Sequence, residues 1–365
     1  MKFSASREAI LKPLHAIIGV VERRQTMPIL SHILLAVDEK GLTVTATDLE
    51  VELRAQAEVE VSGTGETTVP GRKLHDICRA LPEGAAVEVA LSGGRVTVKA
   101  GRSRFTLSTL RAGDFPTVDE VVVQQSLKLD RGQFRHLLEK TQFSMAQQDV
   151  RYYLNGLLLE TAGSTLRAVA TDGHRLALSE MKLEKPAEKD EQVIVPRKGV
   201  LELSRLLEGE GDIELTLGSN HLRVQVDSIR FTSKLIDGRF PEYERVVPKD
   251  PPHMLLAERE ELRAGLQRAA ILSNEKYRGV RLSLDRNRVT MQANNPEQEE
   301  AEEVLEVEYA GEAMEIGFNV NYLLDALGAV DSGKVELGLG DANSSCLIRA
   351  PGQQDTRFVV MPMRL

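Results

Sequence analysis

The segment RFVVMPMRL, residues 357–365, is the last of three copies of one pattern, in which an Arg-Phe strand leads into a proline-containing segment. The earlier copies are RFTLSTLRAGDFPTV, residues 104–118, and RFTSKLIDGRFPEYERV, residues 230–246. The copies are spaced by 126 and 127 positions, measured between Phe105, Phe231 and Phe358. A repeat of this length is a whole domain rather than one turn of a solenoid. The sequence therefore predicts three similar domains, with an apolar end of the third copy that is free to be a docking surface.

The composition indicates aliphatic cores and a reduced chain. Hydrophobic residues make up 42% of the 365 positions, whereas aromatic residues make up only 4% and tryptophan is absent. Each third can therefore bury a core of its own, built mainly from aliphatic side chains. The two cysteines, Cys78 and Cys346, lie in different copies, which indicates an intracellular chain without a disulfide framework.

The sequence also limits where the protein is expected in the cell and which partners it is expected to bind. The start, MKFSASREAILKPL, has no apolar run with a cleavage site, and no stretch approaches the roughly 18–20 apolar residues of a membrane span. We therefore expect a cytoplasmic protein with no signal peptide and no membrane contact. The net charge of −9 argues against a broad nucleic-acid-coating surface, although it is compatible with a local basic face.

One succession of helix and strand patterns recurs in each copy. Apolar residues at three- and four-residue spacing predict an opening helix at 10–18, 127–145 and 260–272. Next we expect a strand at 29–37, 152–160 and 277–285, and then a strand with a polar signature at 42–53, 166–178 and 289–307. A strand then leads into a second helix within 67–81, 193–207 and 316–330, and a hairpin closes each unit at 87–100, 213–226 and 335–350.

These units belong to the α+β class, with two helices on one face of mostly antiparallel strands. Each unit also looks internally doubled, because helix and strands are followed by helix and strands. We expect domains at 1–122, 123–250 and 251–365. The linkers between them are expected near Val118–Ser126 and Pro248–His253.

The helices of the first two copies carry an excess of basic residues. On a single helix such residues are usually solvated surface, but several helices of the same sign in an acidic protein predict one basic surface and an anionic polymer as its partner. Arginine and lysine contacts to phosphates supply affinity without reading bases. The basic residues concerned are Arg72, Lys73, Arg79, Arg131, Arg135, Lys140, Arg197, Lys198 and Arg205.

An acidic run, PEQEEAEEVLEVE at 296–308, lies in the third copy. Such a run is usually a solvated strand edge. It also complements the basic segment GRSRF, residues 101–105, in the first copy. Opposite charges at the two ends of a repeat array favour head-to-tail closure.

Sequence motifs for nucleotide, dinucleotide or ester chemistry are missing. There is no GxxxxGK[ST], no GxGxxG after a strand and no GxSxG, and the seven histidines show no metal-ligand spacing. Asp48 and Asp172 are interpreted as turn residues rather than a carboxylate pair. We therefore expect no catalytic residue, no metal and no cofactor. The enzymatic alternative is a hydrolase using Asp172 and His174, although the sequence shows no partner that would make His174 a general base.

Seven segments carry a resemblance to a known family: FSMAQQDVRYYLNG (143–156), VATDGHRLAL (169–178), VIVPRKGV (193–200), AILSNEKYRGVRL (270–282), NNPEQEEAEE (294–303), EIGFNV (315–320) and VVMPMRL (359–365). They closely resemble the bacterial DNA polymerase III beta subunits, the replicative sliding clamps, and the likeness spans the whole chain. It implies a head-to-tail homodimeric ring of six domains, with helices lining a hole for double-stranded DNA and sheets forming the outer wall.

The resemblance further implies a non-catalytic accessory subunit. Its partners would be the polymerase III alpha subunit, the clamp loader, and other polymerases and repair proteins, all bound through short apolar motifs. A ring scaffold that binds DNA without tethering a polymerase is the other alternative.

Three sets of site residues follow from the same resemblance. DNA contacts are expected from Arg24, Arg72, Arg79, Gln148, Tyr152, Tyr153, Arg197 and Lys198. The second helix of the third copy has FNVNY in place of the VPxRK pattern, so we do not extend DNA contact to it. A partner-peptide pocket is expected from Leu154, Thr171, Gly173, His174, Arg175, Leu176, Pro241, Arg245, Val246, Asn319, Tyr322, Val359, Met361, Pro362 and Met363. The dimer seam is expected to contain Lys73, Arg102, Arg104, Phe105, Leu107, Ile271, Leu272, Glu297, Glu299, Glu300 and Glu303.

Overall fold

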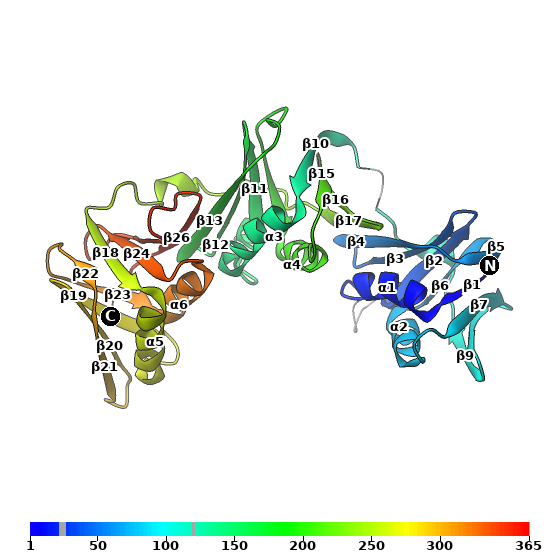
Figure 1. The fold of residues 1–365 in the computed structure, drawn as a ribbon, viewed down its shortest axis with the longest axis horizontal. Coiled ribbons are helices and arrows are strands. Elements are labelled where there is room, and N and C mark those ends of the chain that lie inside the picture. The colour runs from blue at the N-terminus through cyan, green and yellow to red at the C-terminus, as the bar shows by residue number, and fades with distance from the viewer. Residues whose placement is uncertain (22–26, 119–120, 365) are drawn as a thin grey trace. The chain divides into compact units, whose positions relative to one another are not determined.

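The computed structural model describes residues 1–21, 27–118 and 121–364. Arg24, one of the expected DNA contacts, lies outside these described residues. The chain divides into two compact units, one of residues 1–135 with 198–235 and one of residues 136–197 with 236–365. This division cuts through the second repeat, because consecutive repeats share β-sheets. Figure 1 shows the helices and strands of both units.

All three repeats have the same element order, β-α-β-β-β followed by β-α-β-β-β. The first repeat contains β1 Lys2–Ser6, α1 Arg7–Ile17, β2 His32–Asp38, β3 Gly41–Thr47, β4 Val51–Ala57, β5 Glu60–Gly63, β6 Gly65–Pro70, α2 Gly71–Ala80, β7 Ala86–Ser92, β8 Arg95–Ala100 and β9 Ser103–Ser108. The second contains β10 Val123–Asp130, α3 Arg131–Glu139, β11 Gly156–Ala162, β12 Thr165–Thr171, β13 Arg175–Lys182, β14 Glu191–Pro196, α4 Arg197–Leu206, β15 Asp212–Gly218, β16 His221–Val226 and β17 Ile229–Lys234. The third contains β18 His253–Glu258, α5 Arg259–Ala269, β19 Gly279–Asp285, β20 Arg288–Asn294, β21 Glu300–Glu306, β22 Glu308–Tyr309, β23 Met314–Asn319, α6 Val320–Ala329, β24 Lys334–Leu339, β25 Cys346–Arg349 and β26 Thr356–Val360. The α+β class and the internal doubling predicted from the sequence are confirmed, with β5 and β22 as short additions.

The Arg-Phe strands join consecutive repeats. In the first unit β17 pairs antiparallel with β4, so that Phe231 lies opposite Leu53. In the second unit β26 pairs with β13, so that Phe358 lies opposite Ala177. These two pairings build an eight-stranded and a nine-stranded sheet. The remaining Arg-Phe strand, β9 of the first repeat, lies instead at the edge of a five-stranded sheet. Strand β21 of the third repeat lies at the edge of a four-stranded sheet.

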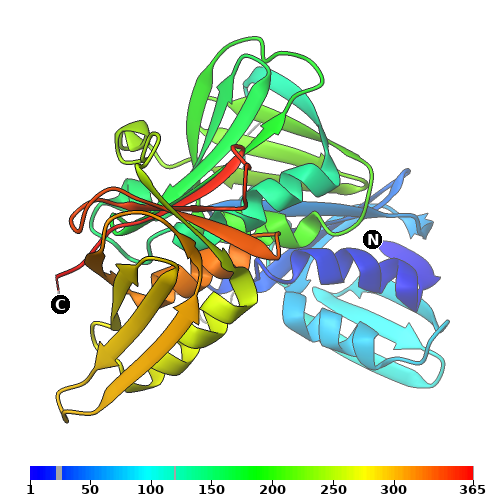
Figure 2. The same ribbon diagram turned by 60° about the vertical axis from the view of Figure 1, so that its left-hand side comes forward.

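Helices pack in pairs on these sheets. Helices α5 and α6 lie side by side, and so do α1 and α2 (Figures 1 and 2). The buried positions of α6 are Val320, Leu323, Ala326 and Leu327, the three- and four-residue spacing of a helix with one apolar face. Leucine, valine and alanine dominate the surrounding core, and Phe318 and Phe358 are its buried aromatic residues together with Tyr309. The aliphatic character predicted from composition is therefore confirmed for this core.

An arginine at the first position of each opening helix ties the two helices of its repeat together. Its guanidinium donates to a backbone carbonyl at the C-terminal end of the second helix. The pairs, donor first, are Arg7 with Arg79 (3.1 Å), Arg131 with Leu206 (2.9 Å) and Arg259 with Val330 (2.5 Å). A cationic donor at this position satisfies carbonyls that have no intrahelical partner and opposes the negative end of the helix dipole.

The second opening helix is shorter than the sequence predicts. Residues 127–145 were expected to form one helix, but Leu127 and Leu129 belong to β10, where buried and exposed residues alternate. Asp130 separates the two elements, because its carboxylate accepts a hydrogen bond from the Gln133 amide at 2.7 Å and so caps α3. The prediction also missed β1 and β18, the corresponding strands of the other repeats, and it placed Val123–Ser126 in a linker.

Each predicted strand with a polar signature is a hairpin. The expected strands at 42–53, 166–178 and 289–307 are the pairs β3–β4, β12–β13 and β20–β21. Asp48 and Asp172 make the first two turns, since each carboxylate accepts hydrogen bonds from two backbone amides that follow it. The interpretation of both aspartates as turn residues is confirmed. The prediction that each of these segments forms one strand was wrong, because each forms two paired strands.

We predict that Arg131→Ala destabilises the protein by about 1–3 kcal/mol, because the carbonyls at the end of α4 lose a charged donor. Arg239→Ala is a matched control, since that side chain is 85% exposed and pairs only at the surface. Urea unfolding followed by circular dichroism measures the difference. Equal midpoints for the two variants would contradict the capping role.

Candidate functional site

The last residues of the described chain are held between the second and third repeats, within the second unit. After β26 ends, the Met361 amide donates to the His174 carbonyl at 2.9 Å, and the Met363 amide donates to the Gly317 carbonyl at 2.8 Å. Met361, Pro362 and Met363 are half-buried. The tail therefore follows a fixed path, with its two methionines available at the surface.

A tight turn at Thr171–Arg175 forms one side of this region. The Asp172 carboxylate accepts hydrogen bonds from the His174 and Arg175 amides at 2.9 and 3.1 Å. Gly173 has φ +89°, and a Cβ there would lie 2.9 Å from the Arg151 guanidinium. The turn therefore requires glycine both for its backbone conformation and for the space that Arg151 occupies.

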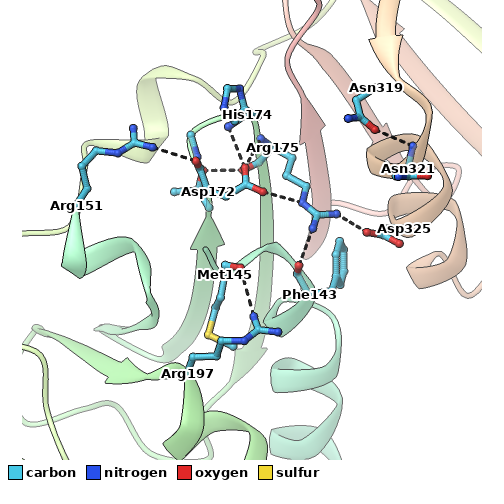
Figure 3. A network of polar contacts seen from close by, with 12 residues as sticks. Phe143, Met145, Arg151, Asp172, His174, Arg175, Arg197, Asn319, Asn321 and Asp325 are labelled. Carbon is cyan, nitrogen blue, oxygen red and sulfur yellow. Dashed lines mark hydrogen bonds and ion pairs between the residues drawn. The ribbon is translucent and has the colours of Figure 1, made fainter. Parts of the chain in front are cut away.

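Arg175 connects this turn to α6 (Figure 3). Its Nε donates to Asp172 at 3.1 Å, one Nη donates to the Phe143 carbonyl at 2.9 Å and the other pairs with Asp325. The guanidinium also lies over the Tyr322 ring, 4.6 Å from its centroid. A planar cation with several donors can hold three chain segments in one geometry. Arg175 thus fixes the turn relative to α6.

Two aromatic rings lie on the α6 side of the site. His174 and Tyr322 stack with centroids 6.4 Å apart and an interplanar angle of 18°. Burial raises the pKa of the Tyr322 hydroxyl, with the Asp172 carboxylate acting in the same direction. The Asn319 side chain caps α6 by accepting from the Asn321 amide at 2.9 Å. These residues give the site a flat, partly polar wall.

An apolar cluster lies on the other side of the turn. Leu176 and Val359 face each other across the β13–β26 pair and are buried. Val246 and Tyr153 pack on the cluster that contains them. Of the remaining expected pocket residues, Leu154 and Thr171 are buried, whereas Pro241 and Arg245 are exposed and Arg245 pairs with Glu242 at 2.6 Å. The structure thus brings most of the expected pocket residues into one region, with an apolar cluster beside an aromatic and charged wall.

Several residues of this region were not selected from the sequence. Arg151, Asp325 and the Phe143 carbonyl shape the turn and the wall through contacts with residues distant in the chain, and Asp149 holds Arg151 in place. The hydrogen bonds from Arg151 hold the pKa of Asp149 at about 2, so that this pair stays ionised. Asp149, Arg151 and Phe143 lie in the resembling segment 143–156, which was the available signal. Asp325 carried none.

Some of the expected DNA contacts are exposed, whereas others are already bonded to groups of the same chain. Arg79, Gln148 and Tyr152 are exposed, with Tyr152 at 57%. Arg72 is half-buried and donates to the Val21 carbonyl at 2.6 Å, and Arg197 donates to the Met145 carbonyl at 3.3 Å. Lys198 forms an ion pair with Asp48 of the first repeat. Tyr153 lies against the apolar cluster at the tail rather than freely at the surface.

The predicted basic surface is smaller than the sequence suggests. Arg131 caps α4, and Lys140 is buried, donating to the Ala329 carbonyl at 2.6 Å and pairing with Asp331. Arg205 donates to the Ala16 carbonyl at 3.3 Å and to Glu202. The prediction that Arg131 and Lys140 contribute to a solvent-facing basic surface was wrong, because both cations satisfy backbone carbonyls.

Arg104, Phe105 and Leu107 lie on the edge strand β9, and Glu300 and Glu303 lie on the edge strand β21. Ile271 and Leu272 belong to a 3₁₀ turn that packs beside β21, and Lys73 belongs to α2. Lys73, Arg102 and Arg104 are exposed, as are Glu297, Glu299 and Glu300. Phe105 and Leu272 are half-buried, Leu107 is buried, and Ile271 is 75% exposed. Glu303 already pairs with Arg268 of its own chain at 2.7 Å, and this hydrogen bond lowers the pKa of the Glu303 carboxyl.

The described residues offer little support for hydrolytic chemistry at this turn. The Asp172 carboxylate is fully used by the turn and by Arg175, and His174 stacks on Tyr322. Over the ranges that the structure describes, no group of three or more His, Cys, Asp or Glu residues could hold a metal ion. Likewise, no described helix is long and apolar enough to cross a membrane.

The chain matches three family models in succession. They describe the N-terminal, central and C-terminal domains of the DNA polymerase III beta subunit, and they match residues 1–119, 128–242 and 244–364. Curated relatives named beta sliding clamp include those of Pseudomonas putida, 54% identical, and Escherichia coli, 52% identical, each covering 100% of both chains.

Solved structures agree with these matches. The crystal structure of the DNA polymerase III subunit beta from Pseudomonas aeruginosa has a TM-score of 0.98 at 52% identity, and that from Caulobacter crescentus 0.96 at 39%, each with full coverage of both chains. Another Pseudomonas aeruginosa structure is bound to griselimycin, with a TM-score of 0.97. The fold and the three matched domains define a three-domain clamp-type protein. The chain belongs to the family of DNA polymerase III beta subunits.

We predict that Arg175→Ala weakens binding of an apolar partner peptide at the tail and lowers stability by about 1–3 kcal/mol, because the Phe143 carbonyl and Asp325 lose their donor. Fluorescence anisotropy with a labelled peptide and urea unfolding measure the two effects. Arg230→Ala, an exposed arginine of the first unit, is the control. Unchanged peptide affinity in Arg175→Ala would show that this network does not shape the pocket.

Proposed function

We propose that this protein is the sliding clamp of the bacterial replicative DNA polymerase. As a homodimeric ring it encircles duplex DNA, slides without sequence specificity and tethers the polymerase. The observation that carries the proposal is the match of all three beta-subunit domains along the chain, at 52–54% identity to curated beta sliding clamps. It acts as a non-catalytic accessory subunit in the cytoplasm. Its domains are proposed at 1–122, 123–250 and 251–365.

Ring closure follows from the strand pairing. The strands β4 and β13 each pair with the Arg-Phe strand of the next repeat. Their counterpart in the third repeat is β21, and the Arg-Phe strand left over is β9. Both are sheet edges, and an unpaired edge is a template for another strand. We propose that β21 of one copy pairs antiparallel with β9 of a second copy, which makes two identical seams in a dimer.

The register of this seam can be read from the two joints within the chain. At these joints the phenylalanine of the Arg-Phe strand lies opposite Leu53 in β4 and opposite Ala177 in β13. Each of these residues comes one position after the residue that pairs with the last residue of the preceding strand. Ala301 occupies the same position in β21. Phe105 is therefore expected opposite Ala301, and Arg104 opposite Glu302. Glu302 lies in the acidic run that was expected at the seam, although it was not named individually. It is a better partner for Arg104 than Glu303, which is engaged by Arg268.

The ring holds DNA by topology rather than by affinity. Exposed cations such as Arg79 make weak phosphate contacts, which carry no sequence information and weaken with salt. The polymerase alpha subunit, the clamp loader, and other polymerases and repair proteins share the pocket at the tail. Methionines suit such varied apolar motifs because their side chains repack easily. A tethered polymerase then acts at high effective concentration.

Topological binding is tested by retention on DNA. The protein is loaded onto a nicked circle by a clamp loader with ATP, the circle is cut once, and release is followed by gel filtration in moderate salt. We expect retention on the circle and loss after linearisation. Release that does not depend on cutting would mean ordinary binding.

We predict that Ile271→Ala with Leu272→Ala weakens the dimer, because truncating buried leucine or isoleucine costs about 2–5 kcal/mol each. Ile271 is 75% exposed in the single chain and becomes buried only if it meets a partner. Sedimentation velocity over a concentration series measures the shift. Leu201→Ala, at a 44% exposed position on α4, is the control, and an unchanged dimer in the double variant would exclude this seam.

Deleting Met361–Leu365 should abolish polymerase binding and leave the dimer intact. Surface-immobilised polymerase alpha subunit measures the first property, and sedimentation the second. Loss of the dimer would place the tail at the seam, and retained polymerase binding would favour a ring scaffold whose partners attach elsewhere.

A further inference from the structure

A second hollow lies on the same sheet face as the tail pocket. Side chains two residues apart on a strand share a face, so Leu178 of β13 lies on the face of Leu176, and Arg357 of β26 on the face of Val359. Leu178 and Arg357 line a cavity of ≈ 680 Å³. Two residues of strand span about 7 Å, so the cavity and the tail pocket are close neighbours.

One short connector separates the two sites. The 3₁₀ turn Tyr243–Arg245 and the residues after it lie over the sheet, with Tyr243 and Val247 in the same apolar cluster as Leu176 and Val359. Arg245 and Val246 belong to the expected tail pocket, whereas Tyr243 and Val247 line the cavity. The cavity therefore adjoins the proposed partner site across this connector.

The floor of the cavity is apolar and partly accessible. It is formed by Leu178, Val247, Leu347 and Met254. Met254 lies in β18, the first strand of the third repeat, and is 36% exposed. An apolar side chain of a ligand would find a matching surface here.

The rim presents cationic donors. Arg167, Lys249, Arg349 and Arg357 line the cavity, against Glu244 and Asp250. Glu180 pairs with both Arg167 (2.7 Å) and Arg357 (3.6 Å), and Glu336 pairs with Arg349 (2.9 Å), but neither carboxylate lines the cavity. The surface that a ligand meets is therefore richer in cations than the cluster as a whole.

Lys249 is the rim cation that is most open to a ligand. It is exposed, and no ion pair of Lys249 is found among the described residues. The Arg357 Nε is buried without a hydrogen-bond partner, but its Nη2 lies 3.6 Å from Glu180, a carboxylate that Arg357 shares with Arg167. An acidic group on a ligand would pair with the Lys249 ammonium and strengthen the weak charge pairing of Arg357.

We propose that this cavity is a second anchor for clamp partners, which takes a short peptide that alternates apolar and acidic residues. The apolar side chain occupies the floor, and the carboxylates meet Lys249 and Arg357 at the rim. Such a segment, lying a few residues from the apolar motif in the tail pocket, would add avidity without a larger interface. That the peptide belongs to a clamp partner rests on the proposed function.

The test uses the methionines as reporters in the full-length dimer. The protein is labelled with ¹³C at the methionine methyl groups and titrated with the peptide Asp-Leu-Glu-Leu-Asp, and in parallel with Lys-Leu-Lys-Leu-Lys. We expect the acidic peptide alone to shift Met254, while Met361 and Met363 report separately on the tail pocket. A shift confined to Met361 and Met363, equal shifts of Met254 by both peptides, or no shift of Met254 would each overturn the proposal.

Charge variants complete the test. Lys249→Glu should weaken binding of the acidic peptide about fivefold at low salt, in line with about 1 kcal/mol for an exposed ion pair. Lys185→Glu, at an exposed lysine on another loop, should not change it. Equal effects of both variants would show that the peptide is attracted by overall charge and not by this site, which would overturn the proposal. The assay needs neither DNA nor polymerase, so its failure is distinct from a failure of DNA retention.

Discussion

The pairing of each Arg-Phe strand with the preceding repeat is the interaction on which the rest of the architecture depends. It converts three similar units into continuous sheets, because β17 completes the sheet of β4 and β26 completes the sheet of β13. The same rule leaves β9 and β21 as edges. An array that joins its units by one repeated contact leaves one unpaired strand edge at each end. In a closed ring both edges find a partner, as the dimeric ring typical of this family provides.

The tail pocket is a by-product of the same pairing. Val359 lies opposite Leu176 because β26 adds to β13, and the residues after Val360 must then leave the sheet beside the turn at Asp172. Arg175 holds that turn to Asp325, 150 positions away in the sequence. The junction between the second and third repeats therefore brings the expected pocket residues of β13, β26 and the tail together.

The sequence was informative where the controlling contacts are local. The repeat, the second helices, the closing hairpins and the turns at Asp48 and Asp172 depend on short-range spacing and turn chemistry, and they could be predicted. The helix at 127–145 was misread because Leu127 and Leu129 fit either a helical or an alternating pattern until Asp130 is recognised as a cap. The bonds of Arg175 and Lys140 could not be predicted, because their partners lie 150 and 191 positions away and composition gives no signal for such pairs.

The charges show why a count of basic residues overestimates a DNA-binding surface. Arg7, Arg131 and Arg259 occupy the same place in each repeat and neutralise helix ends, so their conservation of position across the repeats reflects helix packing. Lys140 and Lys198 are held in ion pairs. Among the described residues, Arg79 is exposed and pairs only with the neighbouring Asp76 at 3.4 Å, so it stays a predicted phosphate contact. For a protein that must slide, sparse contacts are an advantage, because each phosphate bond has to break at every step, and an enclosing ring makes strong binding unnecessary.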